Sequence, residues 1–237
     1  MSGARLQAVF FDVGNTLLYS SPSVSEVCRR ILEDAGHIHD ISVIDSYMPL
    51  VDAYYEERYA EDDGFWTDEQ RTTSVWIGMY SVLCRELGIE DEAVAIARRV
   101  YDEFGRPDRW ALYDDVRPAF ERLRDRGLQV GIISNWDSRL RGLLVGLGLG
   151  DILADIVSSA DVQLHKPDPR IFALACERIG VRPEEAAHVG DHHYADFLGA
   201  SALGMTPVLI DRHGIVADHG VIPIQTLDRI EEVLGLE

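Results

Sequence analysis

The chain has 237 residues, of which 46% are hydrophobic, and its 41 acidic side chains outnumber its 22 basic ones to give a formal net charge of -19. A chain of this length and composition buries a full hydrophobic core, which excludes an intrinsically disordered protein. The acidic excess argues against nucleic acids and anionic membranes as partners, because both are bound through clustered Lys and Arg side chains. A small anionic substrate would need a locally positive site, formed by a metal ion, helix N-termini or a lysine.

The sequence carries no sign of membrane insertion or export. No apolar run reaches about 18 residues, the length that predicts a membrane-spanning helix. The first residues, MSGARLQAVFF, lack the charged start, apolar middle and small-residue cleavage site of a signal peptide. We therefore expect a soluble, cytoplasmic protein, either a monomer or a homodimer, with buried free thiols at its three widely spaced cysteines, Cys28, Cys84 and Cys176.

The first part of the chain predicts one buried strand followed by a helical insertion. Residues 8–12, AVFFD, read as a strand that ends in a carboxylate. The next segment shows no strand alternation and predicts four helices, at 24–35, 43–59, 67–87 and 91–104. We expect a core domain built from residues 1–19 and 109–237, with the helical insertion at 20–108.

From residue 112 onward, short apolar runs alternate with helical patterns. The expected strands lie at 129–134, 155–159, 186–191 and 206–211, and a helical stretch precedes each of them. Repeated alternation of this kind is typical of a parallel sheet covered on both faces. The sequence therefore predicts an α/β fold with a Rossmann-like parallel-sheet core, closed by a helix at 227–237.

Charged and hydroxyl-bearing side chains stand where the predicted strands end. In an open parallel sheet, ligands collect outside the carboxyl ends of the strands. Five such side chains come from four separate parts of the chain: Asp12, Ser134, Lys166, Asp191 and Asp196. Taken singly, each has an ordinary explanation as a turn residue, a helix cap or a surface charge. Their joint placement at one edge of the sheet is what predicts a site.

The three carboxylates indicate a metal ion. Carboxylates brought together repel one another, so either their pKa values rise or a cation lies among them. Hard oxygen ligands at a phosphate site favour Mg2+, with Asp12 and Asp191 as direct ligands and Asp196 as an outer one. Lys166 can offer its ammonium to a carboxylate and to a phosphoryl group, and Ser134 opens a helix where an anionic oxygen is stabilised.

The histidines give a weaker signal. His192 and His193 follow Asp191 directly, and they either contact the site or lie exposed in a loop. His165 and His188 carry no pattern that gives them a role in the site.

These segments resemble the four motifs of the haloacid dehalogenase (HAD) superfamily. DVGNTL is similar to its first motif, IISN to its second, HKPDP to its third and GDHHYAD to its fourth, in that order and along nearly the whole chain. The helical insertion is similar to the α-helical cap of the superfamily's first subclass. The amino-acid sequence around the motifs most resembles the branch named for rhythmically expressed gene 2 and haloacid dehalogenase-like hydrolase domain-containing protein three.

The resemblance implies a phosphatase-type hydrolase that works through a covalent aspartyl phosphate. It makes Asp12 the nucleophile that attacks phosphorus, and it makes Lys166 the group that keeps Asp12 ionised. It also implies that Mg2+ is held by Asp12, the backbone carbonyl of Gly14 and Asp191, with Asp196 nearby. Water then releases phosphate from the intermediate.

The same resemblance implies a small phosphorylated metabolite as substrate. The residues that would bind it are Thr16, Ser134, Asn135 and Lys166. Substrate choice would be set by the cap, through aromatic side chains such as Tyr47, Trp66 or Trp76, although aromatic residues in a small helical domain more often form its core.

The sequence departs from the phosphatase pattern at Gly14. Phosphatases of this superfamily usually carry a second aspartate there, which protonates the leaving group and later activates water. General acid and base help is typically worth about 10²- to 10⁴-fold. Its loss predicts weak or narrow activity, with acyl and aryl phosphates affected least, since their leaving groups depart without protonation.

Two other functions start from the same residues. A 2-haloacid dehalogenase uses the same nucleophile against carbon, but that class has an aromatic residue in place of Gly14 and needs no metal, so the pair Gly190 and Asp191 favours the phosphatase. A catalytically impaired member that binds a phosphorylated ligand or a protein is the second alternative. Gly14 supports it, whereas the retained Asp12, Lys166 and Asp191 argue against it.

Overall fold

The computed structural model describes residues 5–215 and 220–236. The chain divides into two compact units, one formed by Met1–Tyr19 with Leu112–Glu237 and the other by Ser20–Ala111. Four of the N-terminal residues that argued against a signal peptide, and the last residue of the expected closing helix, lie outside the described residues. Within the described ranges, no helix has both the length and the apolar character that crossing a bilayer requires.

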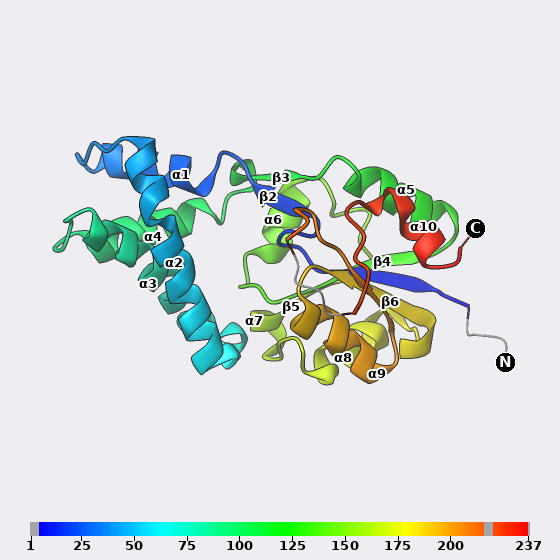
Figure 1. Cartoon of the computed structure of the whole chain (residues 1–237). Helices are drawn as coiled ribbons and strands as arrows, with labels where there is room; N and C mark the ends of the chain where they lie inside the picture. The colour runs from blue at the N-terminus through cyan, green and yellow to red at the C-terminus, as the bar shows by residue number, and fades with distance from the viewer. Residues whose placement is uncertain (1–4, 216–219, 237) are drawn as a thin grey trace. The chain divides into compact units, whose positions relative to one another are not determined.

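The first unit is built on a five-stranded sheet. Its strands are β1 (Ala8–Phe11), β4 (Gln129–Ser134), β5 (Ile156–Ser158), β6 (Ala186–Gly190) and β7 (Thr206–Leu209). They lie in the order β5-β4-β1-β6-β7, and all neighbours are parallel (Figure 1). The predicted α/β, Rossmann-like fold is confirmed, with strand positions within two residues of those expected.

The central strand shows why the sheet is covered on both faces. Successive side chains of a strand leave opposite faces. Phe10 packs with Phe172 and its neighbours in one apolar cluster, whereas Phe11 contacts Phe120, with ring centroids 4.9 Å apart. Both rings of β1 are fully buried, so this strand needs helices on either side.

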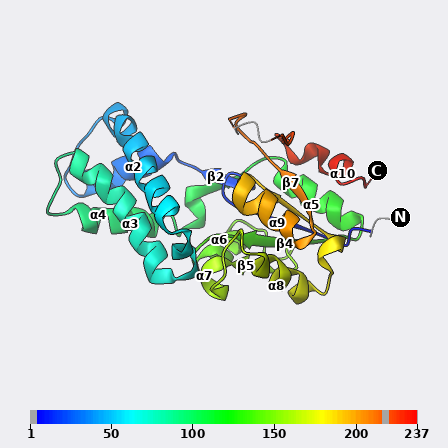
Figure 2. The same ribbon diagram turned by 60° about the horizontal axis from the view of Figure 1, so that its bottom comes forward.

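Helices α8 and α9 cover one face of the sheet, and α5 and α10 cover the other (Figure 1). Figure 2 shows α5 and α10 together again, on the opposite side of the sheet from α8. The helices of this unit are α5 (Val116–Asp125), α6 (Leu140–Gly146), α7 (Ser159–Val162), α8 (Pro169–Ile179), α9 (Gly199–Leu203) and α10 (Ile230–Val233). The expected closing helix is thus short, and a 3-10 turn at Leu227–Arg229 precedes it.

Local sequence signals set the ends of α8. Asp168 accepts a hydrogen bond from the Arg170 amide at 2.9 Å, and Pro169 takes the first helical position. Gly180 ends the helix with a φ of 74°, a left-handed conformation that glycine adopts without strain. These signals hold the chain after Lys166 in a fixed direction.

The second unit consists of four helices around its own apolar core. They are α1 (Val24–Asp34), α2 (Ile41–Glu61), α3 (Glu69–Glu86) and α4 (Ala93–Glu103), as the sequence predicted. A capping box between Ser23 and Glu26 begins α1. Short 3-10 turns lie at Asp63–Thr67 and Pro107–Arg109, and a further one lies in the first unit at Pro183–Glu185.

The two ends of the helical segment meet in a two-stranded ribbon that the sequence did not predict. The ribbon pairs β2 (Leu18–Ser20) with β3 (Trp110–Leu112). β5 is equally short, but it is fully buried and lies within the alternation of strands and helices, whereas β2 and β3 are only partly buried and flank the helical segment. The chain therefore leaves the sheet after β1 and returns to it through adjacent strands.

The three cysteines are free and buried, which leads to a testable prediction. Burial raises the pKa of Cys28 to about 12 and those of Cys84 and Cys176 to about 11. Because the thiolate is the reactive form, we expect all three thiols to resist an aromatic disulfide reagent at pH 8 and to react fully once urea unfolds the chain. Rapid reaction of any thiol in the folded protein would contradict this assignment.

Candidate functional site

The site lies where β1 is flanked by β4 and β6. Asp12 follows β1 directly, and its amide donates to the carbonyl of Val189 in β6 at 2.9 Å. Ser134 is the last residue of β4, and Asp191 follows β6. In-register parallel pairing on both sides of β1 brings these three strand ends to one edge. This edge is the crevice in which open α/β sheets bind ligands.

Lys166 links the carboxylates of the site. Its ammonium donates to Asp12 Oδ1 at 2.6 Å and to Asp196 Oδ1 at 2.5 Å. The Ser134 hydroxyl donates to the same Asp12 oxygen at 2.9 Å. Lys166 is 2% exposed and is the only lysine among the 237 residues. Every other basic side chain apart from the histidines is therefore an arginine, and the sole side-chain ammonium of the sequence is placed in the site.

Asp196 is fixed by three donors. Besides Lys166, the imidazole of His188 lies 2.8 Å from Oδ1, and the backbone amide of His192 donates to Oδ2 at 3.1 Å. Asp196 belongs to a π-helical turn, His193–Leu198, that precedes α9. The preceding Gly190 is required for this packing, because a Cβ there would overlap the Asp196 carboxyl group.

The site has more negative charge than Lys166 can neutralise. Burial, together with the nearby Asp12 and Asp196 carboxylates, raises the pKa of Asp191 well above its ordinary value. Burial also raises the pKa of Asp12, against the opposing effect of Lys166. For Asp196, by contrast, the effect of burial is outweighed by Lys166 and His188, which lower its pKa. An added cation near Asp12 and Asp191 would relieve this excess of charge.

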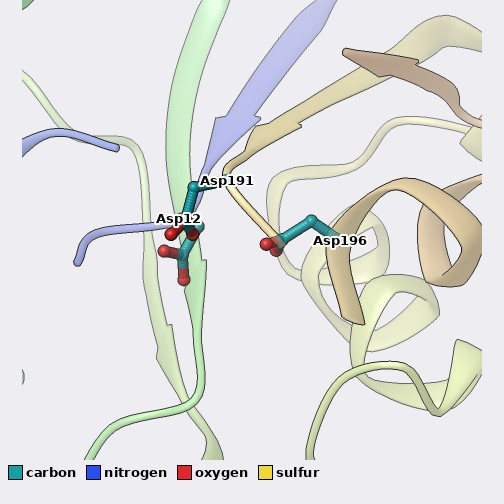
Figure 3. A group of neighbouring side chains, drawn as sticks. All are labelled: Asp12, Asp191 and Asp196. Atoms are coloured by element: carbon teal, nitrogen blue, oxygen red, sulfur yellow. The ribbon is translucent and has the colours of Figure 1, made fainter. Parts of the chain in front are cut away.

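The donor set suits a hard metal ion. Asp12, Asp191 and Asp196 each offer an oxygen, and these oxygens lie within 4.8 Å of one another. Figure 3 shows the carboxyl groups of Asp12 and Asp191 close together, with that of Asp196 directed toward them. Three carboxylate oxygens match Mg2+ chemistry. Since the Asp196 oxygens already accept from Lys166, His188 and His192, Asp12 and Asp191 are better suited to direct ligation.

The other residues predicted to bind substrate have different surroundings. The side-chain amide of Asn135 pairs with the backbone of Lys166 in both directions, at 2.8 and 3.0 Å, and so holds that segment against the end of β4. Thr16 is fully buried, and its hydroxyl oxygen has no hydrogen-bond partner among the described residues. Its backbone carbonyl accepts from Arg212 at 2.7 Å.

Gly14 lies beside the indole ring of Trp136. A Cβ built on Gly14 would meet only Trp136 Cζ3 within 4 Å, at 3.5 Å. This is an ordinary van der Waals distance, so the missing side chain does not reflect a lack of space at its first atom. Trp136 follows directly after the predicted residues Ser134 and Asn135, and sequence reasoning gave it no role.

The histidines divide into two groups. His192, whose side chain is exposed, caps the π-helical turn by accepting from the Ala195 amide at 3.1 Å, and the partly buried His193 stacks on Phe197. His188, to which the sequence assigned no role, is fully buried and contacts Asp196. The available signal was a polar residue in the middle of an otherwise apolar strand, AAHVG.

The aromatic residues expected to select the substrate pack within the helical unit. Trp66 and Trp76 contact each other edge to face, and Trp76 also stacks on Tyr80. Trp66 is 6% exposed, whereas Tyr47 and Trp76 are partly buried against the apolar core of this unit. Part of their apolar surface therefore stabilises this unit.

At the centre of the site, the ammonium of Lys166 and the hydroxyl of Ser134 both donate to one oxygen of the Asp12 carboxylate. The same combination can hold a phosphoryl group and stabilise charge that develops on it. The three sequence motifs that contribute these groups are separated by up to 154 residues, between Asp12 and Lys166. They form one buried, connected network.

Comparison with known proteins identifies the family. The model of the haloacid dehalogenase-like hydrolases matches residues 6–204. Haloacid dehalogenase-like hydrolase domain-containing protein 3 of Danio rerio is 31% identical over 229 residues, which cover 94% of this chain and 93% of that protein. Glyceraldehyde 3-phosphate phosphatase of Methanopyrus kandleri is 30% identical over 217 residues, covering 87% and 84%.

A solved structure agrees with the sequence matches. The crystal structure of a HAD phosphatase from Thermococcus onnurineus has a TM-score of 0.67 at 26% identity and covers 97% of this chain and 98% of its own. The motifs, the strand order and these relatives lead to one conclusion: the chain belongs to the haloacid dehalogenase-like family and is a hydrolase.

Proposed function

We propose that this protein is a Mg2+-dependent phosphatase that hydrolyses a small phosphorylated metabolite in the cytoplasm through an aspartyl phosphate on Asp12. The observation that carries the proposal is the contact of Lys166 and Ser134 with the same oxygen of Asp12. This contact favours the ionised form of the nucleophile and would put two donors within reach of phosphoryl oxygens. The family and the phosphatase named above support it.

The reaction follows from the positions of these groups. Oδ2 of Asp12 attacks phosphorus, a bond forms between them, and the bond from phosphorus to the leaving oxygen breaks. Lys166 and Ser134 stabilise the negative charge on the phosphoryl oxygens, which is the main requirement of phosphoryl transfer. Water then attacks the aspartyl phosphate, which returns the Asp12 carboxylate and releases phosphate.

Asp12, the Gly14 carbonyl and Asp191 would hold Mg2+, and Asp196 would support the site from outside. The ion, when bound, supplies charge neutralisation to the phosphoryl group and to the carboxylates. This role matches the raised pKa values of Asp12 and Asp191. The residues of this chain orient the substrate and supply the nucleophile.

The lack of an acid at Gly14 sets the expected substrate range. A leaving group that is stable as an anion needs no proton, whereas an alkoxide does. We therefore expect acetyl phosphate and p-nitrophenyl phosphate to be hydrolysed faster than an alkyl phosphate. The helical unit, Ser20–Ala111, is proposed to act as a cap that restricts the choice among natural substrates.

The test is phosphate release from these three compounds with Mg2+ and with EDTA. We expect Mg2+-dependent release that disappears in Asp12→Asn. The matched control is Asp168→Asn, which makes the same exchange at the N-cap of α8, where asparagine caps equally well. Absence of release from the wild type would overturn the proposal, and chloride release from a 2-chloro acid in EDTA would favour the dehalogenase alternative.

A further inference from the structure

We propose that His188 is a positioning residue that holds the Asp196 carboxylate, and through it the Lys166 ammonium, in place for the reaction. The inference rests on the proposed function for its catalytic consequence. The hydrogen-bonded chain that carries it runs from His188 through Asp196 and Lys166 to Asp12, with contacts of 2.8, 2.5 and 2.6 Å. His188 is 1% exposed and contacts none of the atoms that would react.

The direction of the hydrogen bond follows from what surrounds Asp196. Its carboxylate accepts from the Lys166 ammonium and from the His192 amide, so it is ionised and acts only as an acceptor. His188 must therefore carry its proton on Nε2 and donate it to Oδ1. The other ring nitrogen, Nδ1, has no hydrogen-bond partner among the described residues. In a neutral ring protonated on Nε2, Nδ1 carries no proton and is a hydrogen-bond acceptor without a donor.

The strand holds the imidazole in this orientation. His188 is the register partner of Phe10 in β1 and of Pro207 in β7, so it leaves the same face as Phe10. Phe172 of α8 packs its ring edge to face against the imidazole, with centroids 5.1 Å apart and planes at 85°. A side chain between a sheet and a helix cannot turn freely, so it can keep the Asp196 carboxylate from rotating.

The position of the Lys166 ammonium links His188 to the nucleophile. Lys166 reaches Asp12 while it also donates to Asp196, and its single ammonium has to satisfy both carboxylates. Without the His188 donor, Asp196 loses one of its three partners and can rotate, which shifts the ammonium away from Asp12. Residues that orient a reacting group in this way are commonly worth about 10- to 100-fold in activity.

The experiment compares three variants. His188→Leu removes the donor, His188→Gln keeps an amide donor at a similar reach, and Leu123→Ala removes a fully buried side chain of α5, on the other face of the sheet, and leaves the contacts of His188 in place. We expect kcat for p-nitrophenyl phosphate to fall about 10- to 100-fold in His188→Leu, to recover most of that loss in His188→Gln, and to change little in Leu123→Ala. Leu123→Ala should lower the Tm, as a packing loss does.

A second readout does not depend on turnover. Because Lys166 is the only lysine in the sequence, 15N-labelled lysine gives one side-chain ammonium signal. Its protons should exchange slowly enough to be seen in the wild type and His188→Gln, since the group is buried and hydrogen-bonded. The signal should be lost in His188→Leu. The 15N shifts of His188 should show a proton on Nε2 only.

The outcomes separate the two proposals. Full kcat in His188→Leu, or an equal loss in His188→Gln, would overturn the role of His188 while the phosphatase stands. A wild type that releases no phosphate would overturn the proposed function. In that case an unchanged Lys166 signal in His188→Leu would also end the positioning proposal, and a lost signal would uphold the structural link.

Discussion

Gly14→Asp should raise kcat/KM for an alkyl phosphate by about 10²-fold or more, since a placed general acid and base is typically worth about 10²- to 10⁴-fold. The position has room for the change: the new Cβ would lie 3.5 Å from Trp136 Cζ3, and the glycine φ is not in the left-handed region. Hydrolysis of acetyl phosphate should gain far less, because its leaving group needs no proton.

The control is Gly14→Asn, which adds a side chain of nearly the same size that cannot transfer a proton. Both variants should be assayed at saturating Mg2+, because the aspartate adds a fourth carboxylate near Asp12, Asp191 and Asp196. Equal rates in the two variants would show that position 14 does not limit the reaction. A larger gain on acetyl phosphate than on the alkyl phosphate would contradict the proposed cause.

Lys166→Met should lower the free energy of unfolding at pH 7 by about 3–5 kcal/mol, because removing one partner of a buried ion pair leaves the other charges uncompensated. Burial alone would lower the pKa of Lys166, but Asp12 and Asp196 outweigh it and raise it, so the ammonium is charged at neutral pH. Phosphate release should fall by about 10²- to 10³-fold, the cost of losing a donor to a developing oxyanion.

The stability difference should depend on pH. The pKa of Asp196 in the wild type lies below its ordinary value, so its contribution to stability is present above the unfolded pKa of about 3.9 and is lost as the pH falls through the lower native value. Urea unfolding at pH 7 and below pH 4 should therefore give a smaller difference in acid.

A double variant provides the control for this interpretation. Adding Asp196→Asn to Lys166→Met removes one of the uncompensated charges and should recover part of the lost stability at pH 7. No recovery would show that the loss comes from the packing of the methionine and not from charge. Activity should remain low in both proteins, because neither carries the ammonium.

The sheet was predictable because its strands are buried on both faces. A short apolar run between two helical patterns, such as QVGIIS, is recognisable as a buried strand, and β4 spans the expected residues. The ribbon of β2 and β3 was not predictable, since its strands are short, only partly buried and lie outside the alternation of strands and helices. In the last crossover, the expected single helix is divided into a π-helical turn and α9, where Asp196 must face Gly190.

Within the site, the chemistry of single residues was easier to predict than their partners. The strand ends indicated Asp12, Ser134 and Asp191, because parallel pairing brings such ends together. The pairing of Asn135 with the Lys166 backbone depends on two segments 31 residues apart and leaves no trace in either. His188 was missed for the same reason, since its partner is set by the turn that follows β6.

The single lysine of this sequence also determines how the folded protein reacts with reagents and enzymes that modify side-chain amines. On side chains, N-acylation, carbamylation and attachment of ubiquitin through an isopeptide bond all require an accessible primary amine, which only lysine carries. Lys166 is 2% exposed and engaged by two carboxylates, and the surface cations are guanidinium groups, which do not react in this way at neutral pH. Over these 237 residues, lysine modification is thus directed to the unfolded chain, at one position whose modification would prevent the site from forming again.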